Sequence, residues 1–372
     1  MRRDEILMIY GEDYQTMTKR LLCEAGLDTM IADKDASIGI KPNILGPYPA
    51  EDGGTTHPQI VAGIIEYLKE HGFHNLTIAE GSWVGDYTRE AFCVCGYEDL
   101  AKQYEVNLLD TQQDTCYEQD CGGLSLHICD CVRQFDFLIN VPVLKGHCQT
   151  GITCALKNMK GLIPNAEKRR FHRLGLHKPI AHLGLGIRQD FIVVDTICGD
   201  PNFEDGGSPF YMNRIFAAAD PVLCDTFGAQ VMGREPEEVP YLSLAEALGV
   251  GSTDLSRAHI RALNEPETLP VLPDTNRVMR VADKAEEVDS CSACYAYLIP
   301  ALDMLAQEGL LDKLTDKVCI GQGYRGQTGT LGVGNCTCGF AHHLEGCPPV
   351  ETEIYQFLKK YIDTRGERSK SI

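Results

Sequence analysis

Hydrophobic and polar residues follow two kinds of pattern along the first 250 residues. Short apolar runs bounded by Gly, Pro or charged residues predict strands, whereas apolar residues spaced three and four apart predict helices. The clearest helix opens with a threonine cap at residues 55–58 and closes at Gly72, with Ile60, Ile64 and Leu68 in helical register. Further strands are predicted at residues 6–10, within 37–43, and at 75–79, 135–144 and 191–196, and further helices at 14–25, 220–233 and 240–248.

The order of these elements predicts the fold class. Strands alternating with helices, with glycines at the junctions, are typical of an α/β fold whose mostly parallel sheet carries helices on both faces. A smaller α/β module follows, with helices at 299–309 and 351–363 around a strand at 317–320. We therefore expect three parts: an α/β domain at 1–263, a connector rich in Pro, Asp and Glu at 264–290, and a cysteine-rich module at 291–372.

Length and composition are those of an ordinary globular protein. The 372 residues correspond to about two domains of roughly 150 residues each, and 44% hydrophobic residues suffice for a core. The longest apolar runs are too short to span a bilayer, and the first residues lack the apolar region of a secretory signal. The sequence therefore predicts a cytoplasmic protein without a membrane partner.

Charge is distributed unevenly along the chain. The net charge of −19 disfavours nucleic acid as a partner, yet the segment 145–178, here called the basic window, holds eight Lys and Arg residues and a single acid, Glu167. A window of +7 in such an acidic chain predicts a surface that binds a small anion. A solvated basic loop is the simpler alternative.

The 17 cysteines form the most informative chemical pattern. In a cytoplasmic chain they predict thiols and metal ligands rather than disulfides, and so many thiols suit a reducing or anaerobic cell. The last 82 residues contain Cys291-Ser292-Ala293-Cys294, then a Cys-x-Cys pair at 336–338 and a Gly-Cys-Pro-Pro at 346–349. Four thiolates with nearby glycines are what a 4Fe-4S cluster requires, and the 41 residues between Cys294 and Cys336 place the ligands on separate loops. Structural zinc and buried unliganded thiols remain alternatives.

Two further patterns stay secondary. The string Gly321 to Gly326 fits GxGxxG, but the glycines that follow it do not favour a helix, so we interpret it as a loop beside the cluster rather than a nucleotide site. A second group of cysteines, whose binding of a metal stays open, comprises Cys93, Cys95, Cys116, Cys121, Cys129 and Cys131.

Polar residues at the carboxyl ends of the predicted strands define a candidate site, because ligands of open parallel sheets bind there. Lysines buried among apolar residues, as expected for Lys145 and Lys157, would need an anionic partner. Each histidine or lysine also has a plain structural explanation, in a helix cap or on a solvated face. The candidates for proton transfer are His147, His172, His177 and Glu80, and those for substrate binding are Lys41, Asn43, Thr56, His57, Lys145, Lys157, Asn158 and Asp195.

Several strings in this part of the chain resemble the domain of unknown function 362 family. They span about residues 38–250 in the family's order, and they are Lys41-Pro42-Asn43, Thr55-Thr56-His57-Pro58, Ala79-Glu80-Gly81, the run from Asn140 to Lys145, the run from Leu156 to Gly161, and Ala219-Asp220-Pro221-Val222. The resemblance implies an architecture, often linked to ferredoxin-like cluster domains, more than a reaction.

The end of the chain is similar to the proximal-cluster module of nickel-iron hydrogenase small subunits. Carried over position by position, this resemblance implies that Cys291, Cys294, Cys336 and Cys347 bind a 4Fe-4S cluster and that Cys338 is spare. The module is shorter here and lacks further cluster motifs after Cys347.

Two function classes follow from these features. In the first, the protein is an iron-sulfur oxidoreductase whose basic residues hold a small anionic substrate. In the second, it is an electron carrier or cluster-bearing binding protein whose basic window docks an acidic, ferredoxin-type partner. A structural zinc protein is a further alternative, and the sequence leaves the oligomeric state open. A basic window that lines a cleft would favour the oxidoreductase, and one that forms a convex patch would favour the electron carrier.

Overall fold

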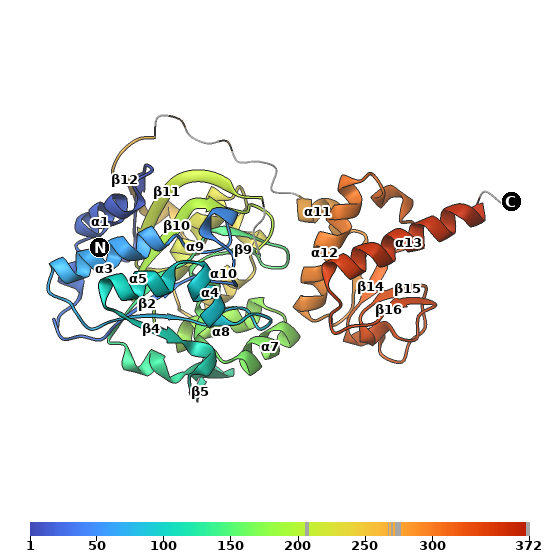
Figure 1. Cartoon of the computed structure of the whole chain (residues 1–372), viewed down its shortest axis with the longest axis horizontal. Coiled ribbons are helices and arrows are strands. Elements are labelled where there is room, and N and C mark those ends of the chain that lie inside the picture. Colours follow the sequence, from blue (N-terminus) through green and yellow to red (C-terminus); the bar gives the residue numbers. More distant parts are fainter. Residues whose placement is uncertain (205–207, 267, 269–270, 272–276, 370–372) are drawn as a thin grey trace. The chain divides into compact units, whose positions relative to one another are not determined.

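A computed structural model describes residues 1–204, 208–266, 268, 271 and 277–369. The chain divides into two compact units, each considered over its described residues and described by itself (Figure 1). The first unit comprises Met1–Phe171 and His177–Pro273, and the second comprises His172–Leu176 and Asp274–Ile372. No helix among the described residues is long and apolar enough to cross a membrane.

The first unit is built on an eight-stranded sheet. All strands run in one direction except β11, which pairs antiparallel with both of its neighbours. The mostly parallel α/β fold predicted from the sequence is therefore confirmed. In spatial order the strands are β12 (His259–Ala262), β1 (Glu5–Tyr10), β11 (Phe210–Ala218), β10 (Phe191–Gly199), β7 (Phe137–Val141), β2 (Ile38–Pro42), β3 (Leu76–Glu80) and β4 (Asn107–Asp110).

Alternation along the strands gives the sheet two faces. In β2, Ile38 and Ile40 join the core cluster formed with α1 (Tyr14–Ala25), α3 (Pro58–Glu70) and α5 (Tyr97–Tyr104). Because successive side chains point to opposite faces, Lys41 projects toward the other layer. Beyond the elements already named, the unit contains α2 (Leu27–Met30), α4 (Thr88–Val94), α6 (Ala155–Asn158), α8 (His177–Gly186), α9 (Pro221–Val231), α10 (Tyr241–Ala247) and the part of α7 (Asn165–Leu174) up to Phe171.

The structure corrects three local predictions. Strand β7 ends at Val141 rather than Leu144, because Pro142 has no N–H to donate to a neighbouring strand. Residues 145–147 instead form β8 (Lys145–His147), which pairs with β9 (Gly151–Thr153) as a separate hairpin. Helix α3 begins directly after His57, and no side chain caps it, so the predicted threonine cap is wrong. The sequence also gave no sign of the hairpin of β5 (Cys116–Asp120) and β6 (Ser125–Cys129).

The second unit is a small parallel sheet with helices. Its strands are β13 (Ala285–Glu287), β14 (Val318–Ile320), β15 (Leu331–Val333) and β16 (His342–Leu344), and its helices are α11 (Arg277–Ala282), α12 (Ser292–Gln307) and α13 (Glu351–Ser369). Helix α12 starts directly after Cys291, so the CxxC motif occupies its first turn.

The stretch expected to be a connector, 264–290, is partly structured. Helix α11 and strand β13 lie within it, and the acidic β13 is accommodated because it is an edge strand whose glutamates stay exposed. Residues 267, 269–270 and 272–276 of the expected connector lie outside the described residues.

Gly161, which follows α6, offers a test of this packing. A Cβ atom at this position would lie 1.9 Å from Glu80 Oε1 and 2.4 Å from Lys41 Cε. We expect Gly161→Ala to lower the free energy of unfolding by about 3 kcal/mol or more, because both neighbours are buried and fixed. Denaturant unfolding measures the loss.

Gly249→Ala is the matched control for Gly161→Ala. No atom lies within 4 Å of a Cβ at Gly249, whose φ of +80° alone would strain an alanine, at a cost of about 1 kcal/mol. Equal losses in the two variants would contradict the steric role of Gly161.

Candidate functional site

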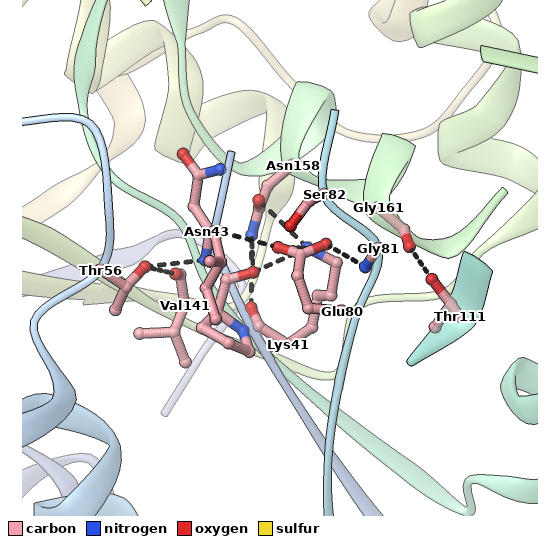
Figure 2. A network of polar contacts seen from close by, with 12 residues as sticks. Lys41, Asn43, Thr56, Glu80, Gly81, Ser82, Thr111, Val141, Asn158 and Gly161 are labelled. Atoms are coloured by element: carbon pink, nitrogen blue, oxygen red, sulfur yellow. Dashed lines mark hydrogen bonds and ion pairs between the residues drawn. The ribbon is translucent and has the colours of Figure 1, made fainter. Parts of the chain in front are cut away.

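A buried ion pair lies at the carboxyl ends of β2 and β3 (Figure 2). Lys41 Nζ lies 2.8 Å from Glu80 Oε2, and both side chains are almost fully enclosed. The carboxylate of Glu80 also accepts hydrogen bonds from the backbone N–H groups of Ile44, at 2.9 Å, and Gly81, at 2.7 Å. Burial lowers the pKa of Lys41, and the charge of Glu80 opposes that effect.

The ammonium group of Lys41 has no proton left for a ligand. An ammonium carries three donors. Besides Glu80, Lys41 Nζ donates to Pro42 O at 2.7 Å and to Asn158 Oδ1 at 3.2 Å. The amide of Asn158 then donates to Asn140 Oδ1 at 2.7 Å, and Asn140 donates to Gln189 Oε1 at 2.6 Å. Lys41 therefore organises a buried polar network, of which the sequence indicated Lys41, Glu80 and Asn158 but not Asn140 or Gln189.

Thr56 and Asn43 lie beside this network. Thr56 Oγ1 accepts the backbone N–H of Asn43 at 2.8 Å and donates to Val141 O at 2.7 Å, tying the chain before α3 to the end of β7 (Figure 2). Two buried oxygens, Asn43 Oδ1 and Ser82 Oγ, have no hydrogen-bond partner. Unsatisfied buried polar atoms are uncommon and often mark a place where a ligand or water binds.

His57 forms a second polar centre, on the α3 face of the sheet. Its Nδ1 and its backbone N each lie 2.8 Å from Asp195 Oδ2, and its Nε2 lies 3.9 Å from Cys198 Sγ. Burial alone would lower the pKa of His57, but the charge and hydrogen bond of Asp195 outweigh it and raise the pKa to about 10. The sequence suggested that Asp195 lies at the end of its strand, but it lies inside β10. No sequence pattern indicated Cys198.

The basic window supplies a third group, around His147. His147 Nε2 lies 3.3 Å from Glu204 Oε1, while Nδ1 accepts the backbone N–H groups of Gln149 and Thr150 at 3.1 and 3.2 Å. Lys157 is half-buried, and burial lowers its pKa to about 8, opposed by the charge of Glu204.

Three more lysines of the window have distinct surroundings. Lys145 is buried and donates to Gly54 O at 2.6 Å. Lys168 is buried and donates to Gly81 O and Ser82 O, and burial lowers its pKa to about 8. Burial, together with the charges of Lys157 and Lys168, holds the pKa of Lys160 well below its usual range. Lys160, which lies inside the family string from Leu156 to Gly161, and Lys168, which follows that string, belong to the basic window but were not among the predicted site residues.

The other two candidate histidines lie elsewhere. His177 begins α8, and its ring stacks on Tyr241 with centroids 6.2 Å apart. His172 is half-buried near the end of α7, in the segment that groups with the second unit. The hydrogen bonds and ion pairs of the first unit thus join candidates in small groups around Lys41, His57 and His147, and His177 belongs to none of them.

In the second unit, two of the four predicted cysteine ligands, Cys291 and Cys294, have raised pKa values. Burial raises the pKa of Cys294 to about 12, and the charges of Cys291, Cys347 and Cys336 act in the same direction. Cys338 is exposed and takes no part in this coupling. All 17 cysteines are free thiols.

The loop 321–326 contributes polar neighbours to these thiols. Gln322 Nε2 donates to Cys291 Sγ at 3.6 Å, and a hydrogen bond with Cys336 raises the pKa of Arg325. Gly334 lies close by, since a Cβ there would be 3.9 Å from Cys294 Sγ. Donors directed at ligand sulfurs are typical of iron-sulfur sites.

Two compact sets of ligand atoms exist among the described residues, each with all of its atoms within 4.8 Å of one another. One is His147, Cys148 and Glu204, and the other is Cys154, Cys224 and Asp225. Neither set includes the four thiols of the second unit or any of the six cysteines considered as a second thiolate group. Metal binding somewhere in this cysteine-rich chain is therefore plausible.

Comparison with known proteins shows the family. Residues 38–230, more than half of the chain, match the family described as Domain of unknown function (DUF362), and the chain belongs to it. The match covers the strand ends that carry Lys41 and Glu80, and helix α6 with Asn158.

Two individual proteins are similar to this chain. A thylakoid-associated protein of Synechocystis sp. is 25% identical over 228 residues, which cover 58% of this chain and 68% of that protein. The lactate racemase apoprotein of Thermoanaerobacterium thermosaccharolyticum is 15% identical, with a TM-score of 0.39. That match covers 60% of this chain and 56% of the racemase, so the chain spans little more than half of that protein.

The Lys41–Glu80 pair can be tested by substitution. We expect Lys41→Met to lower the free energy of unfolding by about 3–5 kcal/mol, because it leaves Glu80 charged and buried without its partner. Lys41→Met combined with Glu80→Gln should restore part of the loss, since the buried charge is gone. Denaturant unfolding of both variants gives the comparison, and a loss below about 1 kcal/mol in the single variant would contradict it.

The His57–Asp195 pair predicts a pH dependence of stability. The pKa of His57 is about 10 in the folded protein and 6.5 ordinarily, so its ion pair stabilises the fold fully below pH 6.5. This stabilisation disappears as the pH rises through 10. At about 1.4 kcal/mol per pKa unit this amounts to a few kcal/mol. The stability difference between wild type and His57→Gln should therefore shrink between pH 7 and pH 10 in urea titrations. A constant difference would contradict the pairing. Lys157 and Lys168 also titrate near pH 8, but both are present in the two proteins, so their effect cancels in the difference.

Proposed function

We propose that this protein is an iron-sulfur redox protein, an oxidoreductase that acts on a small anionic substrate held by the first unit. Burial raises the pKa values of Cys291 and Cys294, and the charges of Cys336 and Cys347 act in the same direction; this grouping of the four thiols carries the proposal. These residues come from α12, from the segment after β15 and from the segment after β16, and the sequence had singled them out.

Four cysteine thiolates are the usual ligand set of a 4Fe-4S cluster. Structural zinc, the alternative, is also held by four cysteines in some sites. Gln322 and Arg325 add donors toward two of the sulfurs. Such a cluster supplies single electrons.

The first unit supplies the anion-binding part of the proposal. Burial and the charge of Lys157 lower the pKa of the half-buried Lys160. His147, whose Nε2 lies 3.3 Å from Glu204 Oε1, offers an N–H for hydrogen bonding or proton transfer. Two ammonium groups held close together favour an anion between them. Lys41 and Lys145 have protein acceptors, and so their role is to support this region rather than to contact the substrate.

A second function is an electron carrier that docks an acidic, ferredoxin-type partner. The exposure of Arg169 and Lys178 favours this alternative, because charged groups at a surface steer a partner of opposite charge. The basic window thus has an inner half suited to a small anion and an outer half suited to a protein. We place either function in the cytoplasm, without nucleic acid or membrane as a partner, on the basis of the charge and composition.

Anaerobic purification with iron and sulfide analysis tests the cluster. We expect about four irons per chain and an EPR signal after reduction. Cys294→Ala should abolish both, whereas Cys338→Ala, the exposed cysteine two residues after Cys336, should retain both. Stoichiometric zinc in place of iron, or equal iron loss in the two variants, would contradict the proposal.

A further inference from the structure

A tight turn fixes the register of the hairpin formed by β5 and β6. Gly122 and Gly123 have φ values of 73° and 87°, in the left-handed region that glycine adopts without steric cost. Across them, the N–H of Cys121 donates to Leu124 O at 2.9 Å. A two-residue turn with positive φ at both positions matches the twist of the flanking strands, and it determines which residues lie opposite each other.

This register places Cys116 of β5 directly opposite Cys129 of β6. Hydrogen-bonded and non-hydrogen-bonded pairs alternate along an antiparallel ladder. The neighbouring pair is a hydrogen-bonded one, because the N–H of Asp130 donates to Thr115 O at 2.9 Å. The two cysteines therefore form a non-hydrogen-bonded pair. In such a pair the Cα atoms are about 4.5 Å apart and both side chains lie on the same face of the hairpin.

A disulfide can form at this separation without moving the strands. Disulfides join Cα atoms that are about 4.4–6.8 Å apart, and both cysteines are free thiols here. The other two cysteines of this stretch are placed differently. Cys121 lies opposite Leu124 at the turn, and Cys131 lies beyond the end of β6, where its N–H donates to Asp114 Oδ2 at 2.8 Å.

The two thiols differ in their access to solvent. Cys116 is exposed, whereas Cys129 is buried and its Sγ donates to Thr111 O at 3.6 Å. Burial raises the pKa of Cys129 to about 12, so this residue stays protonated at neutral pH. An oxidant in solution therefore meets Cys116 first. An accessible thiol beside a second, resolving thiol is the arrangement found at redox-sensitive cysteines.

We infer that Cys116 and Cys129 are a redox-sensitive pair, which a peroxide converts into a disulfide across the β5–β6 hairpin. The Cys116 thiolate attacks one oxygen of hydrogen peroxide, the O–O bond breaks, and hydroxide leaves from the sulfenic acid formed. Cys129 Sγ then attacks the sulfenic sulfur, and its proton leaves with the hydroxyl group as water. The two sulfurs lose two electrons in all, and the peroxide gains them. A dithiol reductant restores both thiols.

Peptide mapping of the whole protein after treatment with hydrogen peroxide tests this pair. Remaining thiols are alkylated with iodoacetamide during unfolding, so that no exchange follows. Cleavage before Asp114, Asp120 and Asp130 separates Cys116 from Cys129. We expect the peptide that begins at Asp114 to be linked to the one that begins at Asp120, and fragmentation to place the link on Cys129. Dithiothreitol should release it.

Two serine variants of exposed cysteines give the matched comparison. Cys116→Ser removes the thiol that meets the peroxide, so the fraction of Cys129 still alkylated after treatment should rise about tenfold over that of the wild type. Cys93→Ser replaces an exposed cysteine of α4 in the same unit, and should leave the amount of linked peptide unchanged. Both substitutions replace an exposed side chain with one of similar size.

The results separate this pair from the proposed cluster, because Cys116 and Cys129 belong to the first unit. A link from Cys116 to Cys121 or Cys131, or full alkylation of both thiols after treatment, would overturn the pair. Equal alkylation of Cys129 in the two variants would also overturn it, since its oxidation would then not require Cys116. Iron is measured in the same samples before treatment. A link without iron supports the pair and contradicts the cluster, and iron without a link does the reverse.

Discussion

The first unit depends on the neutralisation of charge buried at the ends of its parallel strands. Taking Lys41 and Glu80 out of water costs several kcal/mol per ion, and their contact restores this only because other groups satisfy the remaining protons and lone pairs. Backbone N–H groups, the carbonyl of Pro42 and the amide of Asn158 do so. Strands β2 and β3 and helix α6 are thereby held in one arrangement.

The remaining lysines differ in how their protons are used. Lys145 and Lys168 donate to backbone carbonyls and thus stabilise loops near the strand ends. Lys160 is surrounded by burial and like charge, and no acceptor for it is found among the described residues; there Lys157 donates to Thr153 Oγ1 alone. The chemistry of this unit should therefore be sought where charge is left uncompensated rather than where it is most deeply buried. His57 and Asp195 form a compensated pair on the other face.

The second unit places its cysteines by secondary structure. Cys291 and Cys294 belong to the start of one helix, while Cys336 and Cys347 follow two neighbouring parallel strands. Neighbouring parallel strands end at the same edge, so these two cysteines converge although ten residues separate them. Cys338 lies only two residues from Cys336 and is nevertheless exposed, so spacing alone does not select a ligand.

The sequence by itself determined the α/β class, the position of most helices and strands, the basic window and the cysteines of the second unit. These features depend on local periodicity and spacing, which a chain carries without its fold. The tertiary structure alone decided which lysines are neutralised, that Asp195 lies within a strand, that β11 runs antiparallel, and that Asn140, Cys198 and Glu204 join the polar groups. Those outcomes depend on contacts between residues far apart in the chain, and a hydrogen-bond partner across such a distance leaves no periodic trace in the sequence.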